Sequence, residues 1–434
     1  MNPLAAELNA VLEEENPYVL QMLSDLGKQL FFPKGILTQS AEAKEKAHKY
    51  NATIGIATEG DGPMYLQCIQ DKLGNFSPKD IYPYAPPAGK PELRKLWRDK
   101  MLEENPSLQG KHFSNPVVTS ALTHGLSIVG DLFAGEGDVF VMPDMMWGNY
   151  NLTFGVCNKA KIQKFNTFTP EGGYDIAAFK ETLVSVAKEQ GKAIVLLNFP
   201  NNPSGYTPSV AEGEAIIATI TEVAESGCNI VAVTDDAYFG LFYEDSMKES
   251  LFGKLANLHP RVLAVKLDGA TKEEYVWGFR TGFITFAAGD TAAKPRLIEA
   301  LEKKTMGVIR AKISNCPHPS QTFVIEALSS PDFKAQKEQK YQVMKGRALE
   351  VKRVLDNGDF ADVWEYYPFN SGYFMCLKLK TVDAEQLRVH LLEKYGVGTI
   401  SIGKTDLRIA FSCIAEENIA ELFDLVYKAA KDLS

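Results

Sequence analysis

The stretch Lys192–Gly205 reads KAIVLLNFPNNPSG, a short apolar run followed by a loop of asparagine, proline, serine and glycine. A continuous apolar run of this length that ends in turn-forming residues is typical of a strand buried on both faces of a parallel sheet. Similar runs occur at four other places, and these are NPVVTS (115–120), DVFVMP (138–143), NIVAVTDD (229–236) and RVLAVKLDG (261–269). The sequence therefore predicts a sheet of buried strands.

Segments with helical periodicity lie between these runs. After NPVVTS, apolar side chains recur on one helical face at Leu122, Leu126, Val129 and Phe133. Strands that alternate with helices predict an α/β large domain over residues 63–320, with a mainly parallel sheet flanked by helices. A long charged helix at 332–355 and later amphipathic segments predict a smaller α+β domain. We assign residues 1–62 and 321–434 to an N-terminal arm and this small domain.

The composition excludes several classes of protein. The 434 residues are 45% hydrophobic and 23% charged, which suits a globular protein with a large core. The net charge is −9 and no long basic run occurs, which argues against a nucleic-acid partner. The beginning of the sequence lacks a leader pattern, and no apolar run approaches the roughly 20 residues that span a bilayer. We therefore expect a cytoplasmic protein with no membrane partner.

Cysteine and histidine spacing predicts no metal site. The six cysteines form no C-x-x-C pair, and the six histidines lack the spacing of metal ligands. The glycines of Gly135-Glu-Gly137 do not continue into G-x-G-x-x-G, so no dinucleotide site is predicted either. Scattered single cysteines fit a reducing compartment.

Three segments at predicted strand ends carry the polar residues that indicate a function. They are residues 198–205 (NFPNNPSG), 234–240 (TDDAYFG) and 269–282 (GATKEEYVWGFRTG). Taken alone, the first segment is typical of a turn. An aspartate in the second segment is typical of a helix N-cap, and a residue such as Lys272 is typical of a solvated surface. The carboxyl ends of parallel strands are nevertheless where ligand sites form in α/β folds.

In this order and spacing, the three segments resemble the class I aminotransferases, which are fold-type I pyridoxal-phosphate enzymes and include aspartate and aromatic amino-acid aminotransferases. The resemblance rests on N-P-S-G at residues 202–205, D-D-A-Y at 235–238, and Lys272 followed eight residues later by Arg280. It covers roughly residues 50–415. It implies the two-domain fold expected above and pyridoxal 5'-phosphate as cofactor.

The resemblance assigns a role to each matching residue. Lys272 would form the internal Schiff base and carry a proton between the substrate α-carbon and the cofactor. Arg280 would bind the cofactor phosphate and favour the neutral amine of Lys272 by like-charge repulsion. Glu273 and Glu274 would oppose this effect unless they point outward. Asp235 would pair with the protonated pyridine nitrogen, whereas Asp236 fills a position where the family carries no required acid.

Further matches complete the expected cofactor site. Tyr238 and Asn202 would hydrogen-bond the phenolic oxygen of the cofactor, and Trp147 would stack on its ring. The segment Ser120–Gly125 joins a strand to a helix, so its amides would face the phosphate. The remaining expected cofactor-binding residues are Leu122, Thr123, Thr271 and Tyr84. The hydroxyl of Thr271 would replace that of a serine which relatives carry at the position of Gly269. Tyr84 would come from a neighbouring subunit.

Substrate recognition is expected from two arginines. Arg408, in DLRIAFS, resembles the small-domain arginine that binds the α-carboxylate, which a planar guanidinium suits. Arg310, in RAKISNCP, resembles the arginine that a partner subunit contributes to the distal carboxylate of aspartate or glutamate. Ala57 stands where a substrate-contacting glycine is usual, and Asn202 is a second candidate contact to the carboxylate. Shared residues imply a homodimer with shared active sites.

The predicted function is transfer of an amino group from aspartate or an aromatic amino acid to a 2-oxo acid, with 2-oxoglutarate as the expected acceptor. A carbon–sulfur β-lyase or an amino-acid decarboxylase on the same fold is the alternative, because the cofactor stabilises carbanions in each case. Arg310 weighs against the lyase. A regulator with a DNA-binding module is a third class, but the first 60 residues are too short for that module and the charge is unfavourable.

Overall fold

The computed structural model describes residues 1–434 apart from residues 16, 31–34 and 290–294. Its largest element is a seven-stranded sheet in the order β4-β10-β9-β8-β7-β5-β6. The strands of this sheet are β4 (Val117–Ser120), β5 (Val139–Pro143), β6 (Lys161–Phe165), β7 (Lys192–Asn198), β8 (Asn229–Asp235), β9 (His259–Gly269) and β10 (Thr281–Gly289). Only β10 runs antiparallel to its neighbours, so the prediction of a mainly parallel sheet is confirmed.

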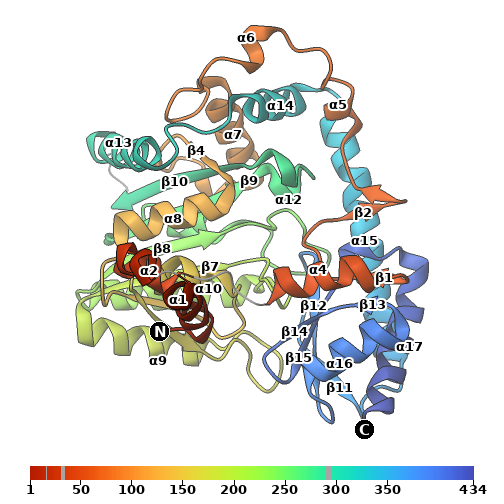
Figure 1. Ribbon diagram of the computed structural model, residues 1–434. Coiled ribbons are helices and arrows are strands. Elements are labelled where there is room, and N and C mark those ends of the chain that lie inside the picture. Colours follow the sequence, from red (N-terminus) through yellow and green to blue (C-terminus); the bar gives the residue numbers. More distant parts are fainter. Residues whose placement is uncertain (16, 31–34, 290–294) are drawn as a thin grey trace.

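Helices pack against this sheet, as the alternating sequence pattern predicts (Figure 1). Strand β7 is buried at every position after Lys192, which explains why its sequence is continuously apolar. The helix predicted after NPVVTS is α8, and its apolar stripe packs against β9 and β10. The helices of this part of the chain are α7 (Pro91–Glu104), α8 (Ala121–Phe133), α9 (Ile176–Gln190), α10 (Val210–Glu225), α11 (Leu251–Leu255), α12 (Ala270–Glu273), α13 (Pro295–Lys312) and α14 (His318–Ser329).

A second, antiparallel sheet lies in the C-terminal part of the chain, in the order β11-β12-β15-β14. The long charged helix predicted there is α15, which in Figure 1 runs from the neighbourhood of α5 and α14 to α17. The elements of this part are α15 (Phe333–Asn357), β11 (Trp364–Tyr366), β12 (Phe374–Leu379), α16 (Ala384–His390), β13 (Val397–Gly398), β14 (Ile400–Ile402), β15 (Asp406–Ala410) and α17 (Ile419–Asp432).

The N-terminal segment joins this second part. Strand β1 (Tyr50–Asn51) pairs in parallel with β13, and α4 (Ile36–Lys46) packs against β13 and β14. These contacts concern α4 and β1 only, so the grouping of residues 1–62 with 321–434 stays a prediction. The other elements before α7 are α1 (Pro3–Glu15), α2 (Pro17–Met22), α3 (Asp25–Gln29), β2 (Thr58–Glu59), β3 (Gly62–Pro63), α5 (Gln67–Gln70) and α6 (Pro78–Ile81). No helix within the described ranges is long and apolar enough to cross a membrane.

The loop after β7 connects the two parts of the fold. The carbonyl oxygen of Gly205 accepts hydrogen bonds from the backbone N–H groups of Asn370 (2.9 Å) and Ser371 (3.0 Å). Gly205 has φ +76°, and a Cβ atom there would lie 2.0 Å from the carbonyl oxygen of Phe374 and 2.9 Å from that of Ser371. Only glycine fits this contact, because the atoms that a side chain would meet belong to backbone.

We predict that Gly205→Ala lowers the free energy of unfolding by about 3 kcal/mol or more, because overpacking against backbone adds to the left-handed strain. Gly137→Ala is the matched control, since Gly137 has φ +86° but open space at its Cβ, and it should lose only about 1–2 kcal/mol. Urea unfolding of both variants measures the difference. Equal losses would show that Gly205 contributes nothing through the contact between the two parts.

Candidate active site

A cavity of about 200 Å³ opens at the carboxyl ends of the large sheet, where strands β4, β7, β8 and β9 end and β12 and β15 of the second sheet approach. Ten of the predicted site residues line it: Leu122, Thr123, Trp147, Asn202, Asp235, Tyr238, Thr271, Lys272, Arg280 and Arg408. The fold thus brings together residues that lie up to 286 positions apart, from Leu122 to Arg408.

Lys272 lies on α12, the four-residue helix that directly follows β9. Its backbone carbonyl accepts a hydrogen bond from the hydroxyl of Tyr373 at 3.0 Å, and its amine lies 5.1 Å from the centre of the Tyr238 ring. Burial lowers the pKa of Lys272 to about 8, Asp235 opposes this shift, and the positive charge of Arg280 adds to it. The neutral amine that nucleophilic chemistry requires is therefore far more accessible near neutral pH than that of an ordinary lysine.

Asp235, the last residue of β8, faces the same cavity. Its carboxylate accepts hydrogen bonds from the hydroxyl of Tyr150 (2.6 Å) and from the backbone N–H of Ala237 (3.2 Å). Burial raises the pKa of Asp235 to about 6, and the Tyr150 hydrogen bond and the charge of Lys272 limit the rise. Tyr150 is a site residue that the sequence does not predict, because nothing in its sequence context distinguishes it from a core tyrosine.

The loop after β7 links Asp235 to Arg408. The side-chain amide of Asn198 donates to the carbonyl of Asp235, and its oxygen accepts from the backbone N–H of Asn202, both at 2.9 Å. The side-chain oxygen of Asn202 in turn accepts from Arg408 at 3.1 Å. Asn198 is a second site residue without a predicted role, although it is the first residue of the motif at residues 198–205.

Arg408 carries a buried charge without a carboxylate partner among the residues that the structure describes. Its guanidinium donates to the carbonyl of Thr53 at 2.9 Å and lies 4.1 Å from the centre of the Phe374 ring, while its Nε has no hydrogen-bond partner. Burial lowers the pKa of Arg408. Because a buried charge is unfavourable without a counter-ion, this arginine suits an anionic ligand.

The other end of the cavity has the features of an anion site. The backbone N–H of Ala121, the first residue of α8, donates to the carbonyl of Arg280 at 3.0 Å, and both residues have positive φ angles of 61° and 53°. Such strain persists where surrounding structure enforces it, often at ligand sites. The buried hydroxyl of Thr271 has no hydrogen-bond partner, and Thr123 and Arg280 line the cavity beside it.

Three of the predicted residues do not line the cavity. Tyr84 is 90% exposed, and Arg310 is exposed and donates to the hydroxyl of Ser314 at 2.6 Å. Both side chains are predicted to act in the active site of a neighbouring subunit, and not in the site of their own chain. Ala57 is fully buried, and Gly55, two residues earlier, lines the cavity instead.

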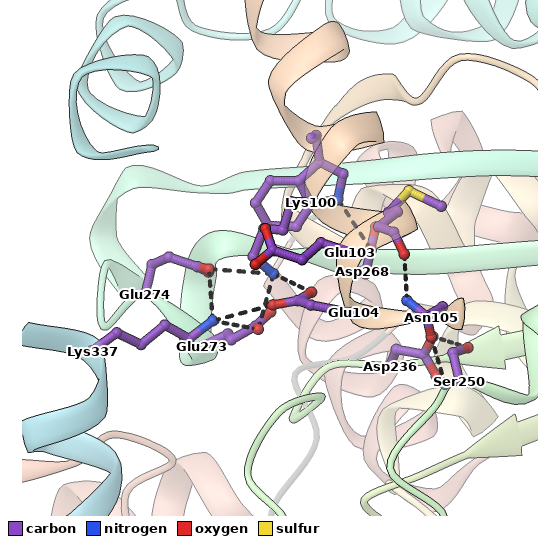
Figure 2. Close-up of polar contacts among 12 residues, drawn as sticks. Lys100, Glu103, Glu104, Asn105, Asp236, Ser250, Asp268, Glu273, Glu274 and Lys337 are labelled. Carbon is purple, nitrogen blue, oxygen red and sulfur yellow. Dashed lines mark hydrogen bonds and ion pairs between the residues drawn. The ribbon is translucent and has the colours of Figure 1, made fainter. Parts of the chain in front are cut away.

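Glu273 and Glu274 point away from the cavity. Figure 2 shows their carboxylates directed toward Lys337, with Lys100 and Glu104 nearby. The condition for a neutral Lys272 amine is therefore met. Asp236 also turns away from the cavity and forms a buried ion pair with Lys266. No group of three or more histidine, cysteine, aspartate or glutamate side chains within the described part of the chain is arranged to hold a metal ion.

Comparison with known proteins identifies the family. Residues 67–426 match the family "Aminotransferase class I and II", and the chain belongs to this family of pyridoxal-phosphate-dependent aminotransferases. A curated relative, the probable aspartate/prephenate aminotransferase of Aquifex aeolicus, is 26% identical over 422 residues, which are 92% of this chain and 97% of the relative.

Solved structures confirm the fold. An aminotransferase from Anaerococcus prevotii superimposes with a TM-score of 0.83 at 23% identity, covering 94% of this chain and 98% of that one. A kynurenine aminotransferase from Pyrococcus horikoshii superimposes with a TM-score of 0.78 at 16% identity, covering 96% and 98%. The predicted fold-type I architecture is therefore confirmed.

The charges around Lys272 predict opposite effects of two substitutions on its pKa. Asp235→Asn removes a carboxylate that raises this pKa, so the pKa should fall below about 8. Arg280→Met removes a like charge, so the pKa should rise. Because only the neutral amine reacts, acylation of Lys272 in the cofactor-free protein should begin at lower pH in the first variant and at higher pH in the second.

Peptide mass spectrometry of the acylated protein as a function of pH measures both shifts. Arg353→Met is the matched control, because it removes an exposed arginine outside the cavity and should leave the profile unchanged. Shifts of the same sign in both variants would contradict the assigned electrostatics.

Proposed function

We propose that the protein transfers the amino group of aspartate or an aromatic amino acid to 2-oxoglutarate in this cavity, with pyridoxal 5'-phosphate as cofactor. One observation carries the proposal: a partly buried lysine with a lowered pKa shares the cavity with a buried carboxylate and with a buried arginine that lacks a carboxylate partner among the described residues. These are the groups needed to move a proton, to stabilise a cation and to hold the carboxylate of a substrate.

The residues present fit the cofactor. Thr271 offers an unpartnered buried hydroxyl, and with Arg280 and Thr123 it would hold the phosphate. Leu122 would contact the phosphate end, and Trp147 would cover one face of the ring. When bound, pyridoxal 5'-phosphate supplies an electron sink for negative charge at the substrate α-carbon.

The side chains of this chain would supply the remaining steps. Asp235 would keep a proton on the ring nitrogen of the cofactor, and Tyr150 would hold the Asp235 carboxylate in place. Tyr238 and Asn202 would donate hydrogen bonds to the phenolic oxygen. Lys272 would bind the cofactor and then move the proton of the α-carbon.

Substrate would be held by its carboxylates. Arg408 would bind the α-carboxylate, and Asn202 already contacts the same guanidinium. Gly55 and Ala57 lie on the segment beside the carbonyl of Thr53, which accepts from Arg408, so this segment would border the substrate. Closure against the small-domain strand β15 would orient the α-carbon–hydrogen bond toward Lys272.

A homodimer with shared sites accounts for the two exposed predicted residues. The carbonyls of Pro83 and Ala85, which flank Tyr84, are hydrogen-bonded to the side chains of His318 (2.6 Å) and Asn315 (3.0 Å), and the latter lies five residues after Arg310. Tyr84 and the segment after Arg310 therefore share one region of the surface. From there Tyr84 would reach the partner's cofactor phosphate, and Arg310 the distal carboxylate of the partner's substrate.

Replacing Lys272 with Ala should abolish turnover while leaving the fold intact, because the proton acceptor and the cofactor's attachment point are both removed. The measurement is the absorption spectrum of the cofactor-loaded protein, titrated in turn with aspartate, glutamate, tyrosine, phenylalanine and alanine. Conversion to the amine form of the cofactor, reversed by 2-oxoglutarate, should occur in the wild type only. Release of ammonia or carbon dioxide in place of that conversion would favour the lyase or the decarboxylase, and full activity of the variant would refute the role of Lys272.

Mixed dimers test the shared sites. Chains with Lys272→Ala, co-refolded with chains carrying Tyr84→Ala and Arg310→Met, should recover about a quarter of wild-type activity, since half of the dimers are hybrids with one intact site. The matched control is a mixture of Lys272→Ala chains with Asp235→Asn chains. Both defects then lie in residues that each chain contributes to its own site, so no recovery is expected. Equal results in the two mixtures would contradict shared sites.

A further inference from the structure

The two residues that follow Lys272 belong to a cluster of ion pairs, and Figure 2 shows Glu273 and Glu274 together with Lys100 and Lys337. None of these four side chains lines the cavity that Lys272 lines. Glu273 is bonded to Lys337 at 2.5 Å and to Lys100 at 2.9 Å, and Glu274 lies 3.4 Å and 3.6 Å from the same two amines. Glu104 pairs with Lys100 at 2.7 Å. The side chains of Glu273 and Glu274 are only 5% and 1% exposed, so these two carboxylates are shielded from water, whereas Lys337 and Glu104 are 22% and 28% exposed.

Three carboxylates share two ammonium groups in this cluster. Burial opposes ionisation of Glu273, but Lys100 and Lys337 outweigh it and lower its pKa to about 2. Burial and the neighbouring charge of Glu273 raise the pKa of Glu274 to about 7, and one oxygen of Glu274 has no hydrogen-bond partner. Glu273 therefore carries the charge that binds both lysines, whereas Glu274 holds a proton for much of the time at neutral pH.

The cluster ties a short helix to two longer ones. Helix α12 has four residues, too few to bury an apolar stripe. Glu273 connects it to Lys100 on α7 and to Lys337 on α15. The backbone of Gly240, two residues after Tyr238, also approaches Glu273, since a Cβ atom there would lie 2.9 Å from its carboxylate.

Helix α15 extends from this cluster to the strand that carries Arg408. Ten residues after Lys337, Arg347 donates to the carbonyl of Ser412 (2.5 Å), just beyond β15, and to that of Thr58 (2.7 Å). One helix thus contacts both the segment that bears Lys272 and the segment that bears Arg408.

We propose that Glu273 is a positioning residue for Lys272: together with Lys100 and Lys337 it fixes α12 to α7 and α15, and so sets the place of the Lys272 amine relative to Arg408. This inference rests on the proposed function of Lys272 as the group that moves the α-carbon proton. It concerns residues that touch neither cofactor nor substrate, and it makes Lys337 the connection between the reacting lysine and the small domain.

Lys337→Met tests the proposal, with Lys334→Met as its matched control. Lys334 lies one turn earlier on α15, pairs with Glu103 at 2.5 Å and has a side chain that is 77% exposed. Its substitution therefore removes the same charge but leaves the buried cluster intact. In the cofactor-loaded enzyme, Lys337→Met should lower kcat about tenfold, because small displacements of a reacting group cost rate. The KM for the amino donor should stay within about twofold, because Arg408 still binds it. Lys334→Met should match the wild type in both constants.

The two glutamates provide an internal comparison. Glu273→Gln should reproduce the loss of kcat, since it removes the charge that holds both lysines. Glu274→Gln should lose less than about twofold, because a carboxyl group that already holds a proton resembles an amide. The pH midpoint of the absorption change of the lysine-bound cofactor should move in Lys337→Met and Glu273→Gln, and stay at the wild-type value in Glu274→Gln and Lys334→Met.

The outcomes separate positioning from stability alone. Lys337→Arg keeps the charge and should retain most of the wild-type kcat. This variant can still be measured if Lys337→Met does not fold. Lower melting temperatures with wild-type kcat and an unmoved pH midpoint in Lys337→Met and Glu273→Gln would overturn the proposal and leave the proposed function intact. A wild-type protein that forms no lysine-bound cofactor would overturn the proposed function, and this inference with it.

Discussion

The burial of charged groups is the constraint on which the rest of the structure depends. A charge taken out of water needs a partner, or its protonation equilibrium shifts toward the neutral form. Lys272 shows the second outcome, with a pKa of about 8, and Glu273 shows the first, with a pKa of about 2. These residues are adjacent in the chain, and the short helix that carries them directs one into the cavity and the other away from it.

This separation explains how a run of charges can serve a reactive site. In the sequence, Lys-Glu-Glu at residues 272–274 is typical of a solvated surface. In the fold the side chains of Glu273 and Glu274 are buried and that of Lys272 is partly buried. Lysines from helices that are distant in the chain neutralise Glu273, and Glu274 lies beside the same two lysines. The carboxylates would otherwise stabilise the charged form of Lys272. Their pairing with Lys100 and Lys337 leaves Asp235 and Arg280 as the charges that shift the pKa of the lysine.

The sequence predicts those parts of the fold and site that local patterns encode. Buried strands such as β7 are continuous apolar runs, and motifs at strand ends must meet because parallel strands end at one edge. Tyr150 and Phe374 could not be predicted, since their roles depend on Asp235 and Arg408 across the fold. The sequence predicts Ala57 as a substrate contact, whereas Gly55, two positions earlier, lines the cavity. The prediction is off by two residues because no local signal fixes the register of this irregular segment. Lys337 carries no signal at all, as a lysine on a charged helix is ordinary.

Burial of charged and polar groups also makes the site costly to the protein without ligand. Arg408 is a fully buried cation with one unpartnered nitrogen, and Thr271 is a buried hydroxyl with no partner. Both groups weaken the free protein, because desolvation is not repaid by hydrogen bonds. Two anionic groups, a carboxylate at Arg408 and a phosphate at Arg280 and Thr271, would satisfy them together. The arrangement that costs stability in the free chain is therefore the one that makes binding of a carboxylate and a phosphate favourable, and the ion cluster next to Lys272 keeps the lysine between them.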